Sequence, residues 1–178
     1  MPRYLALLGS INVGGNRLTM ADLRAAFETE GFANVETVVA SGNVLFDHPE
    51  RPEDGLEEKL ALMMRHRFGF DSVALVRSRD ALVAAIAENP FAADGQENFV
   101  HTLFLDRAVD PDGFARLQND RTGPERLAAG DRALHIDYVA GAGESKLVGK
   151  FIERRLGARG TARNLRSMKR ILAKMDEV

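Results

Sequence analysis

A glycine-rich loop near the start of the chain carries the residue types best suited to hold a small ligand. It spans residues 10–17, between an apolar stretch and a predicted helix. Two consecutive glycines, Gly14 and Gly15, let backbone N–H groups turn toward an anion, and the N-terminus of the following helix adds partial positive charge. The side chains that could add hydrogen bonds or charge are Asn12, Asn16 and Arg17. We expect either a small anionic ligand here or a loop whose glycines only allow a tight turn.

A second candidate is the segment 161–164, which joins two predicted basic helices. Arg163 could bind a carboxylate or phosphate with two parallel hydrogen bonds, and Asn164 or Thr161 could cap the last helix. The alternative is an arginine that forms only an intramolecular ion pair. If the segment converges with the loop at residues 10–17, Arg163 and Asn164 would complete the predicted anion site.

A third glycine-rich segment, 141–146, precedes another predicted helix. The spacing from Gly143 to Gly149 and Lys150 is one residue too long for a phosphate loop, and Phe151 stands where that motif needs Ser or Thr. The segment is therefore interpreted as a connection in which Ser145 caps the helix.

The sequence contains no recognisable catalytic or metal-binding pattern. It has no cysteine, its four histidines lack metal-ligand spacing, and no serine lies in a G-x-S-x-G turn. His101 and His135 fall in predicted strands, where hydrogen-bonded structural histidines are expected. We therefore predict no catalytic residue, no metal and no cofactor.

The charge is unevenly distributed along the chain. Residues 144–178 contain ten Lys or Arg and four Asp or Glu, a balance of +6, so residues 1–143 carry −8. The basic tail either docks on the acidic body or binds an anionic partner such as RNA, DNA or a phosphorylated metabolite. Base stacking would be weak, because the chain has no Trp and two Tyr. A protein-protein interaction module, acting through a sheet or the loop around Phe91, is the third alternative.

The apolar periodicity predicts two similar series of elements. The first is a strand at 4–8, a helix between Thr19 and Gly31, a hairpin at 35–46, a helix at 56–68, a strand at 72–76 and a helix at 79–88. The second has a strand at 101–105, a helix at 110–118, a hairpin at 125–139, a helix at 145–156 and a last helix near the C-terminus. This order indicates an α+β fold of two successive ferredoxin-like, βαββα-type units, with antiparallel sheets covered by helices and a C-terminal basic helix pair. The predicted division is 1–88, a connecting loop at 89–98, and 99–178.

The N-terminal apolar stretch ends at Gly9, which is far too short to span a membrane. Together with the absence of cysteine, this predicts a cytoplasmic protein with no membrane partner.

Several segments resemble the bacterial family called domain of unknown function 1697. They are residues 4–16 (YLALLGSINVGGN), 20–24 (MADLR), 31–32 (GF), 41–44 (SGNV) and 161–164 (TARN). The resemblance runs the length of the chain and implies a two-part ferredoxin-like α+β fold with no established activity.

Overall fold

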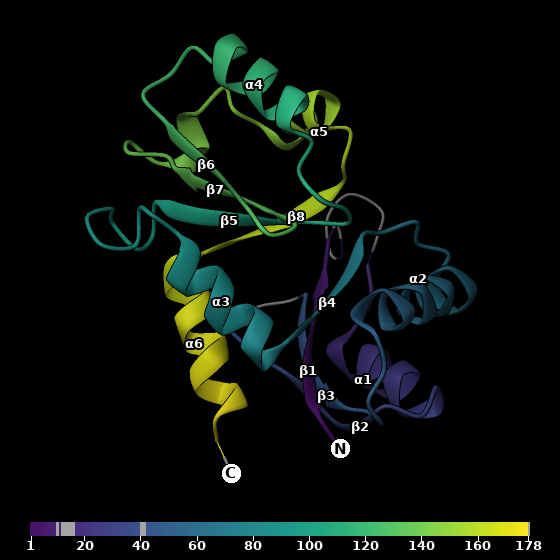
Figure 1. Cartoon of the computed structure of the whole chain (residues 1–178). Coiled ribbons are helices and arrows are strands. Elements are labelled where there is room, and N and C mark those ends of the chain that lie inside the picture. Colours follow the sequence, from purple (N-terminus) through teal and green to yellow (C-terminus); the bar gives the residue numbers. More distant parts are fainter. Residues whose placement is uncertain (10, 12–16, 40–41, 178) are drawn as a thin grey trace. The chain divides into compact units, whose positions relative to one another are not determined.

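The computed structural model describes residues 1–9, 11, 17–39 and 42–177, which fold into two α+β units (Figure 1). The first unit comprises Met1–Leu82 and Arg170–Val178, and the second comprises Val83–Lys169. The C-terminal residues thus belong to the unit that also contains the N-terminus. The boundaries at residues 88 and 99 stay a prediction.

The first unit has a four-stranded antiparallel sheet in the order β2-β3-β1-β4. Its elements are β1 (Arg3–Leu8), α1 (Met20–Thr29), β2 (Ala33–Thr37), β3 (Asn43–Asp47), α2 (Glu53–Phe68), β4 (Ala74–Ser78) and the start of α3 (Arg79–Glu88). The second unit repeats this arrangement in the order β6-β7-β5-β8. Its elements are β5 (Val100–Leu105), α4 (Pro111–Asp120), β6 (Arg126–Gly130), β7 (Ala133–Asp137), a 3-10 turn (Ala142–Glu144), α5 (Gly149–Leu156), β8 (Gly160–Asn164) and the start of α6 (Leu165–Met175). The predicted α+β architecture of two ferredoxin-like units is confirmed.

Capping residues mark the ends of several helices. Thr19 caps α1 because its hydroxyl accepts a hydrogen bond from the Asp22 N–H at 3.0 Å. Asp110 caps α4 in the same way, and Pro111 follows it at the first helical position. Gly69 ends α2 with φ of 71°, a left-handed conformation that glycine adopts without strain.

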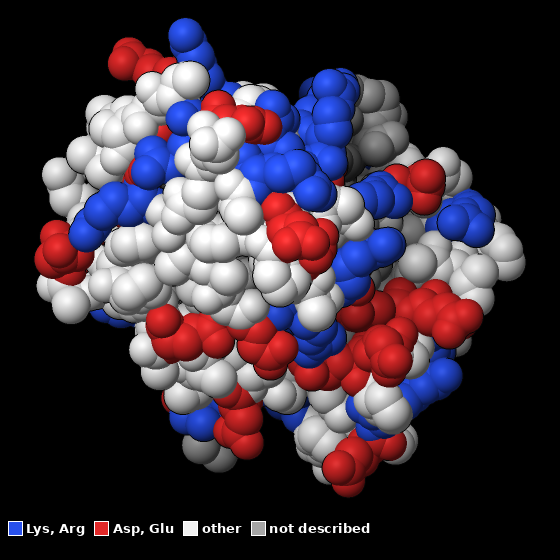
Figure 2. Space-filling model, turned by 45° about the horizontal axis from the view of Figure 1, so that its top comes forward, with Lys and Arg blue, Asp and Glu red and all other residues white. Residues whose placement is uncertain are grey.

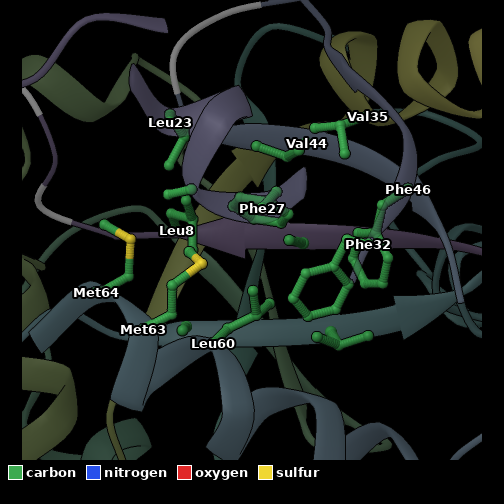
Figure 3. Close-up of a cluster of buried hydrophobic side chains, with 14 of the residues drawn as sticks. Leu8, Leu23, Phe27, Phe32, Val35, Val44, Phe46, Leu60, Met63 and Met64 are labelled. Carbon is green, nitrogen blue, oxygen red and sulfur yellow. The ribbon is translucent and has the colours of Figure 1, made fainter. Parts of the chain in front are cut away.

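Aromatic rings form a cluster within the core of the first unit, where α1 and α2 cover one face of the sheet (Figure 3). The Phe46 ring on β3 lies 4.8 Å from Phe32, 5.7 Å from Tyr4 and 5.9 Å from Phe27, measured between ring centroids. The Tyr4 pair is stacked and the other two are tilted or edge-on, and such ring pairs add to the stabilisation from burial itself. Leu60, Met63 and Met64 of α2 fill the remaining space.

Two glutamates of α2 cover the β4 edge of the first sheet. The Glu57 carboxylate accepts a hydrogen bond from the Val76 N–H, and the Glu53 carboxylate accepts one from the Ser78 N–H, both at 3.0 Å. Residues four apart on a helix share a face, which is why both reach the same strand. Edge amides satisfied in this way are not available for pairing with another chain.

The core of the second unit lies between its sheet and the helices α4 and α5. Leu103 and Leu105 of β5 and Leu134 and Ile136 of β7 project from one face of the sheet into this layer. The two helices approach each other closely at Gly113, where an added Cβ would lie 2.6 Å from the Arg155 carbonyl oxygen. Only glycine fits there without displacing the backbone of α5.

The structure corrects two predictions about the C-terminal region. The segment 161–164, predicted to join two helices, lies within strand β8 and pairs with β5 from Gly160 to Asn164. The helix predicted to start at Ser145 begins at Gly149, with Val148 at its N-cap. Ser145 caps a local turn instead, because its Oγ accepts a hydrogen bond from the Leu147 N–H at 3.0 Å.

No helix in the described part of the chain is long and apolar enough to cross a membrane.

Candidate functional site

The predicted anion site is only partly covered by the structure. Asn12, Gly14, Gly15 and Asn16 lie outside the described residues, and Arg17, which follows them, is exposed. The convergence of this loop with residues 163 and 164 therefore stays a prediction.

Arg163 and Asn164 lie at the end of β8 in the second unit. The Asn164 side-chain oxygen accepts a hydrogen bond from the Ser167 N–H at 2.8 Å, so the predicted cap on the last helix is confirmed. Arg163 donates to the Thr161 hydroxyl at 2.7 Å and to the Ala162 carbonyl at 2.8 Å. Burial lowers the pKa of Arg163 to about 10, which leaves the guanidinium charged at neutral pH.

A hydroxyl, an imidazole and a carboxylate follow one another on the face of the second sheet that carries Arg163. The Thr102 hydroxyl lies 2.9 Å from Nδ1 of His135, and Nε2 of His135 lies 2.5 Å from the Glu88 carboxylate. This order matches that of a catalytic triad, but Thr102 and His135 are both 0 % exposed. Neither residue lines any of the pockets described below, so we interpret these residues as a structural network, as expected for a strand histidine.

A pocket of about 230 Å³ lies around Glu125 in the second unit and is here called the Glu125 pocket. It lies between two connecting segments, one leading from α4 to β6 and the other from β7 to α5. The residues that line it are 122–125, Tyr138, Ala140, Gly141 and 144–146. A cavity of about 20 Å³ adjoins it, and Glu125 and Lys146 line both spaces.

Glu125 is the unusual residue of this pocket. It is 4 % exposed, its Oε1 accepts a hydrogen bond from the Ser145 hydroxyl, and its Oε2 has no hydrogen-bond partner among the described residues. Buried carboxylate oxygens without a partner are costly and therefore rare. Ser145 is itself fixed by the Leu147 N–H, so the pair holds one carboxylate oxygen in place, while the other is buried beside Gly123 without a donor in the described part of the chain.

Gly123 makes room for this carboxylate. A Cβ at position 123 would lie 2.1 Å from Oε2 and 2.6 Å from Oε1 of Glu125. The Glu125 carboxylate therefore packs against Gly123, and it fits there because glycine has no side chain.

Tyr138 forms the wall opposite this loop. Its ring packs edge-on against the ring of His101, with 5.0 Å between centroids, and its hydroxyl donates to the Leu147 carbonyl at 3.4 Å. Burial, and secondarily the negative charge of Glu125, raises the pKa of the Tyr138 phenol. The next residue, Val139, has φ of 61°, a strained conformation for a β-branched side chain of the kind that often occurs at binding sites.

A second hollow of about 420 Å³ in this unit is centred on Arg126. Its charged groups are already paired, because Arg126 donates to Asp94 at 2.9 Å and also to Asp137. The same guanidinium lies 4.7 Å from the centre of the Phe91 ring. The charged side chains of this hollow are therefore already hydrogen-bonded, whereas the Glu125 pocket has a carboxylate oxygen without a partner among the described residues.

Basic side chains of the tail take part in ion pairs within each unit. Arg155 pairs with Asp120 at 3.0 Å in the second unit, and Lys174 approaches Glu36 at 3.9 Å in the first. Figure 2 shows groups of Lys and Arg atoms with Asp and Glu atoms between them on the face in view. These pairs favour the interpretation that tail charges meet acidic residues of the body. An anionic partner of the tail stays a prediction.

No group of three or more His, Asp or Glu side chains in the described ranges could hold a metal ion.

Sequence reasoning missed Glu125, which it placed at the start of a predicted strand. The nearest signal is the sequence Gly123-Pro124-Glu125, in which a glycine lies two residues before a carboxylate. The segment 141–146, which the sequence predicts to be only a connection, has its residues 144–146 beside this carboxylate.

Comparisons with known proteins place this architecture in a family. The chain is similar to a conserved bacterial protein, SP0830 from Streptococcus pneumoniae, with a TM-score of 0.78, 24% sequence identity and coverage of 99% of both chains. At this identity the likeness establishes the fold. No curated protein matches the sequence. The family described as "Protein of unknown function (DUF1697)" matches residues 1–135, about three quarters of the chain. The chain therefore belongs to the DUF1697 family.

Proposed function

We propose that this protein binds a small molecule in the Glu125 pocket, with Oε2 of Glu125 accepting a hydrogen bond from the ligand. The observation that carries the proposal is a buried carboxylate oxygen without a hydrogen-bond partner at the wall of a pocket of about 230 Å³. Small-molecule sites combine apolar walls with fixed polar groups, and here Pro124, Tyr138 and Ala140 lie beside Glu125 and Ser145.

The positions of the neighbouring residues support a preorganised site. Ser145 holds the first carboxylate oxygen, and Gly123 leaves space for the second. A ligand group that donates to Oε2 would therefore meet an acceptor whose orientation is already set. The small anion that the sequence predicts at residues 10–17 is not the ligand proposed here, because the negative charge of Glu125 would repel an anion from the Glu125 pocket.

Two substitutions remove this acceptor by different routes. Glu125→Gln replaces the carboxylate by an amide of the same shape, and Gly123→Ala places a methyl group where the carboxylate lies. We expect each variant to bind the best ligand of a fragment panel about tenfold or more weakly, because a hydrogen bond to a charged group contributes about 1.5–3 kcal/mol. Binding is measured by titration of ¹H–¹⁵N spectra, in which residues 122–125 and 138–146 should show the largest shifts.

Glu144→Gln is the matched control. Glu144 also lines the pocket but is exposed, so loss of its charge should weaken binding by less than about fivefold. Thermal unfolding of all three variants checks that they remain folded. The proposal is wrong if ligands from the panel shift residues elsewhere only, or if Glu125→Gln binds them as tightly as the native protein.

A further inference from the structure

We infer that the ligand group held by Glu125 is the protonated primary amine of a small molecule with a short apolar body. The inference rests on the proposed function and narrows it to one chemical class. It follows from the charge of the pocket, the geometry of its free acceptor and the nature of its walls.

The charge of the Glu125 pocket favours a cation. Its lining includes two carboxylates, Glu125 and Glu144, and one ammonium, Lys146. Glu125 is buried, whereas Lys146 and Glu144 are exposed. Solvent therefore screens the charges of Lys146 and Glu144 more strongly than the charge of Glu125. A monovalent cation would neutralise the remaining negative charge, whereas a phosphate or carboxylate would add to it.

The free acceptor favours a primary ammonium over a neutral hydroxyl. An ammonium has three donors, so one N–H can reach Oε2 of Glu125 while the others face solvent or backbone carbonyls. Hydrogen bonds between two ionised groups are roughly twice as strong as those between neutral groups.

The walls favour a compact apolar body. Pro124, Tyr138 and Ala140 present carbon-rich surfaces, and the volume of about 230 Å³ suits a single ring or a short alkyl chain rather than a nucleotide. His101 behind Tyr138 keeps that wall in place.

A series of four ligands of similar shape tests the inference on the whole protein. The probes are benzylamine, benzyl alcohol, benzoate and benzyltrimethylammonium, each titrated into the native protein and into Glu125→Gln at pH 7. We expect benzylamine to bind about tenfold or more tightly than benzyl alcohol and benzyltrimethylammonium, and benzoate to bind most weakly. The preference for benzylamine over benzyl alcohol should disappear in Glu125→Gln.

The outcomes separate the inference from the proposed function. If benzyl alcohol or benzoate shifts the pocket residues with an affinity equal to that of benzylamine, the pocket binds ligands but the amine inference is overturned. If benzyltrimethylammonium equals benzylamine, charge alone decides binding, and the hydrogen bond from a primary ammonium is overturned. If none of the four probes and no fragment shifts residues 122–125 or 138–146, the proposed function fails as well.

Discussion

Replacing Phe46 by alanine is expected to destabilise the first unit by about 3–5 kcal/mol. The Phe46 side chain is 0 % exposed and lies within contact distance of three other aromatic rings. Truncation removes its buried surface and also leaves a cavity, because Phe27 is held in α1 and Phe32 in the short connection to β2, so that both can collapse only partly. Urea unfolding measures the change, followed through backbone amide signals of β1 and β3.

Leu62→Ala provides the matched control for this prediction. Leu62 lies on α2 in the same unit but is 45 % exposed, so its truncation should change the free energy of unfolding by less than about 0.5 kcal/mol. A loss below about 1 kcal/mol in Phe46→Ala would contradict the packing described for this core. Because the chain has two units, signals from each unit are fitted separately.

Gly160→Ala is expected to destabilise the second unit by about 3 kcal/mol, the upper end of the range for overpacked sites. A Cβ at this position would lie 2.2 Å from the Phe104 carbonyl oxygen and about 3 Å from the side chains of Leu105 and Leu103. The nearest atom belongs to the backbone of the central strand β5 and cannot rotate away. The strand β8 must therefore shift, which weakens its pairing with β5.

Gly149→Ala is the control in the same unit. No heavy atom lies within 4 Å of the added Cβ, and the residue is helical, so stability should stay the same or rise by up to about 1 kcal/mol. Hydrogen exchange of the β5 and β8 amides measures how strongly the pairing of these strands is protected in each variant. Equal protection of these amides in Gly160→Ala and in the native protein would show that the close approach of the two strands is wrong.

The alternation of apolar residues and the capping residues make most of the fold predictable. Thr19 and Asp22 predict the start of α1, and the spacing of Leu56, Leu60 and Met63 predicts α2. These signals are local, because a helix cap or an apolar stripe depends on residues within one or two turns. The repeat of the series predicts two similar units, and the strand orders confirm it.

Strand β8 and the start of α5 could not be predicted in this way. Gly160–Asn164 contains one aliphatic residue, Ala162, so it shows no apolar alternation and becomes a strand through its pairing with β5. Ser145 has the side chain of a helix cap, but it bonds to Glu125, twenty residues earlier in the chain, and α5 begins later. In both cases contacts distant in sequence decide the local structure.

The Glu125 pocket could not be predicted either, because it also depends on contacts between residues distant in sequence. Glycine-rich loops are visible in a sequence, whereas a carboxylate without a partner is defined only when residues 138–146 fold against residues 122–125. The sequence predicts that Thr161 or Asn164 caps the last helix, and the structure has Asn164 in this role, an interaction that spans three residues. It does not reveal that Glu125 is buried, because glutamate side chains are almost never fully buried unless they are paired.

A crystal structure of the protein with benzylamine tests the central claim most directly. The claim predicts the amine nitrogen about 2.7–3.2 Å from Oε2 of Glu125, with the ring against Tyr138 and Pro124. Benzylamine bound elsewhere on the protein, or in the pocket with its nitrogen turned away from Glu125, would contradict it.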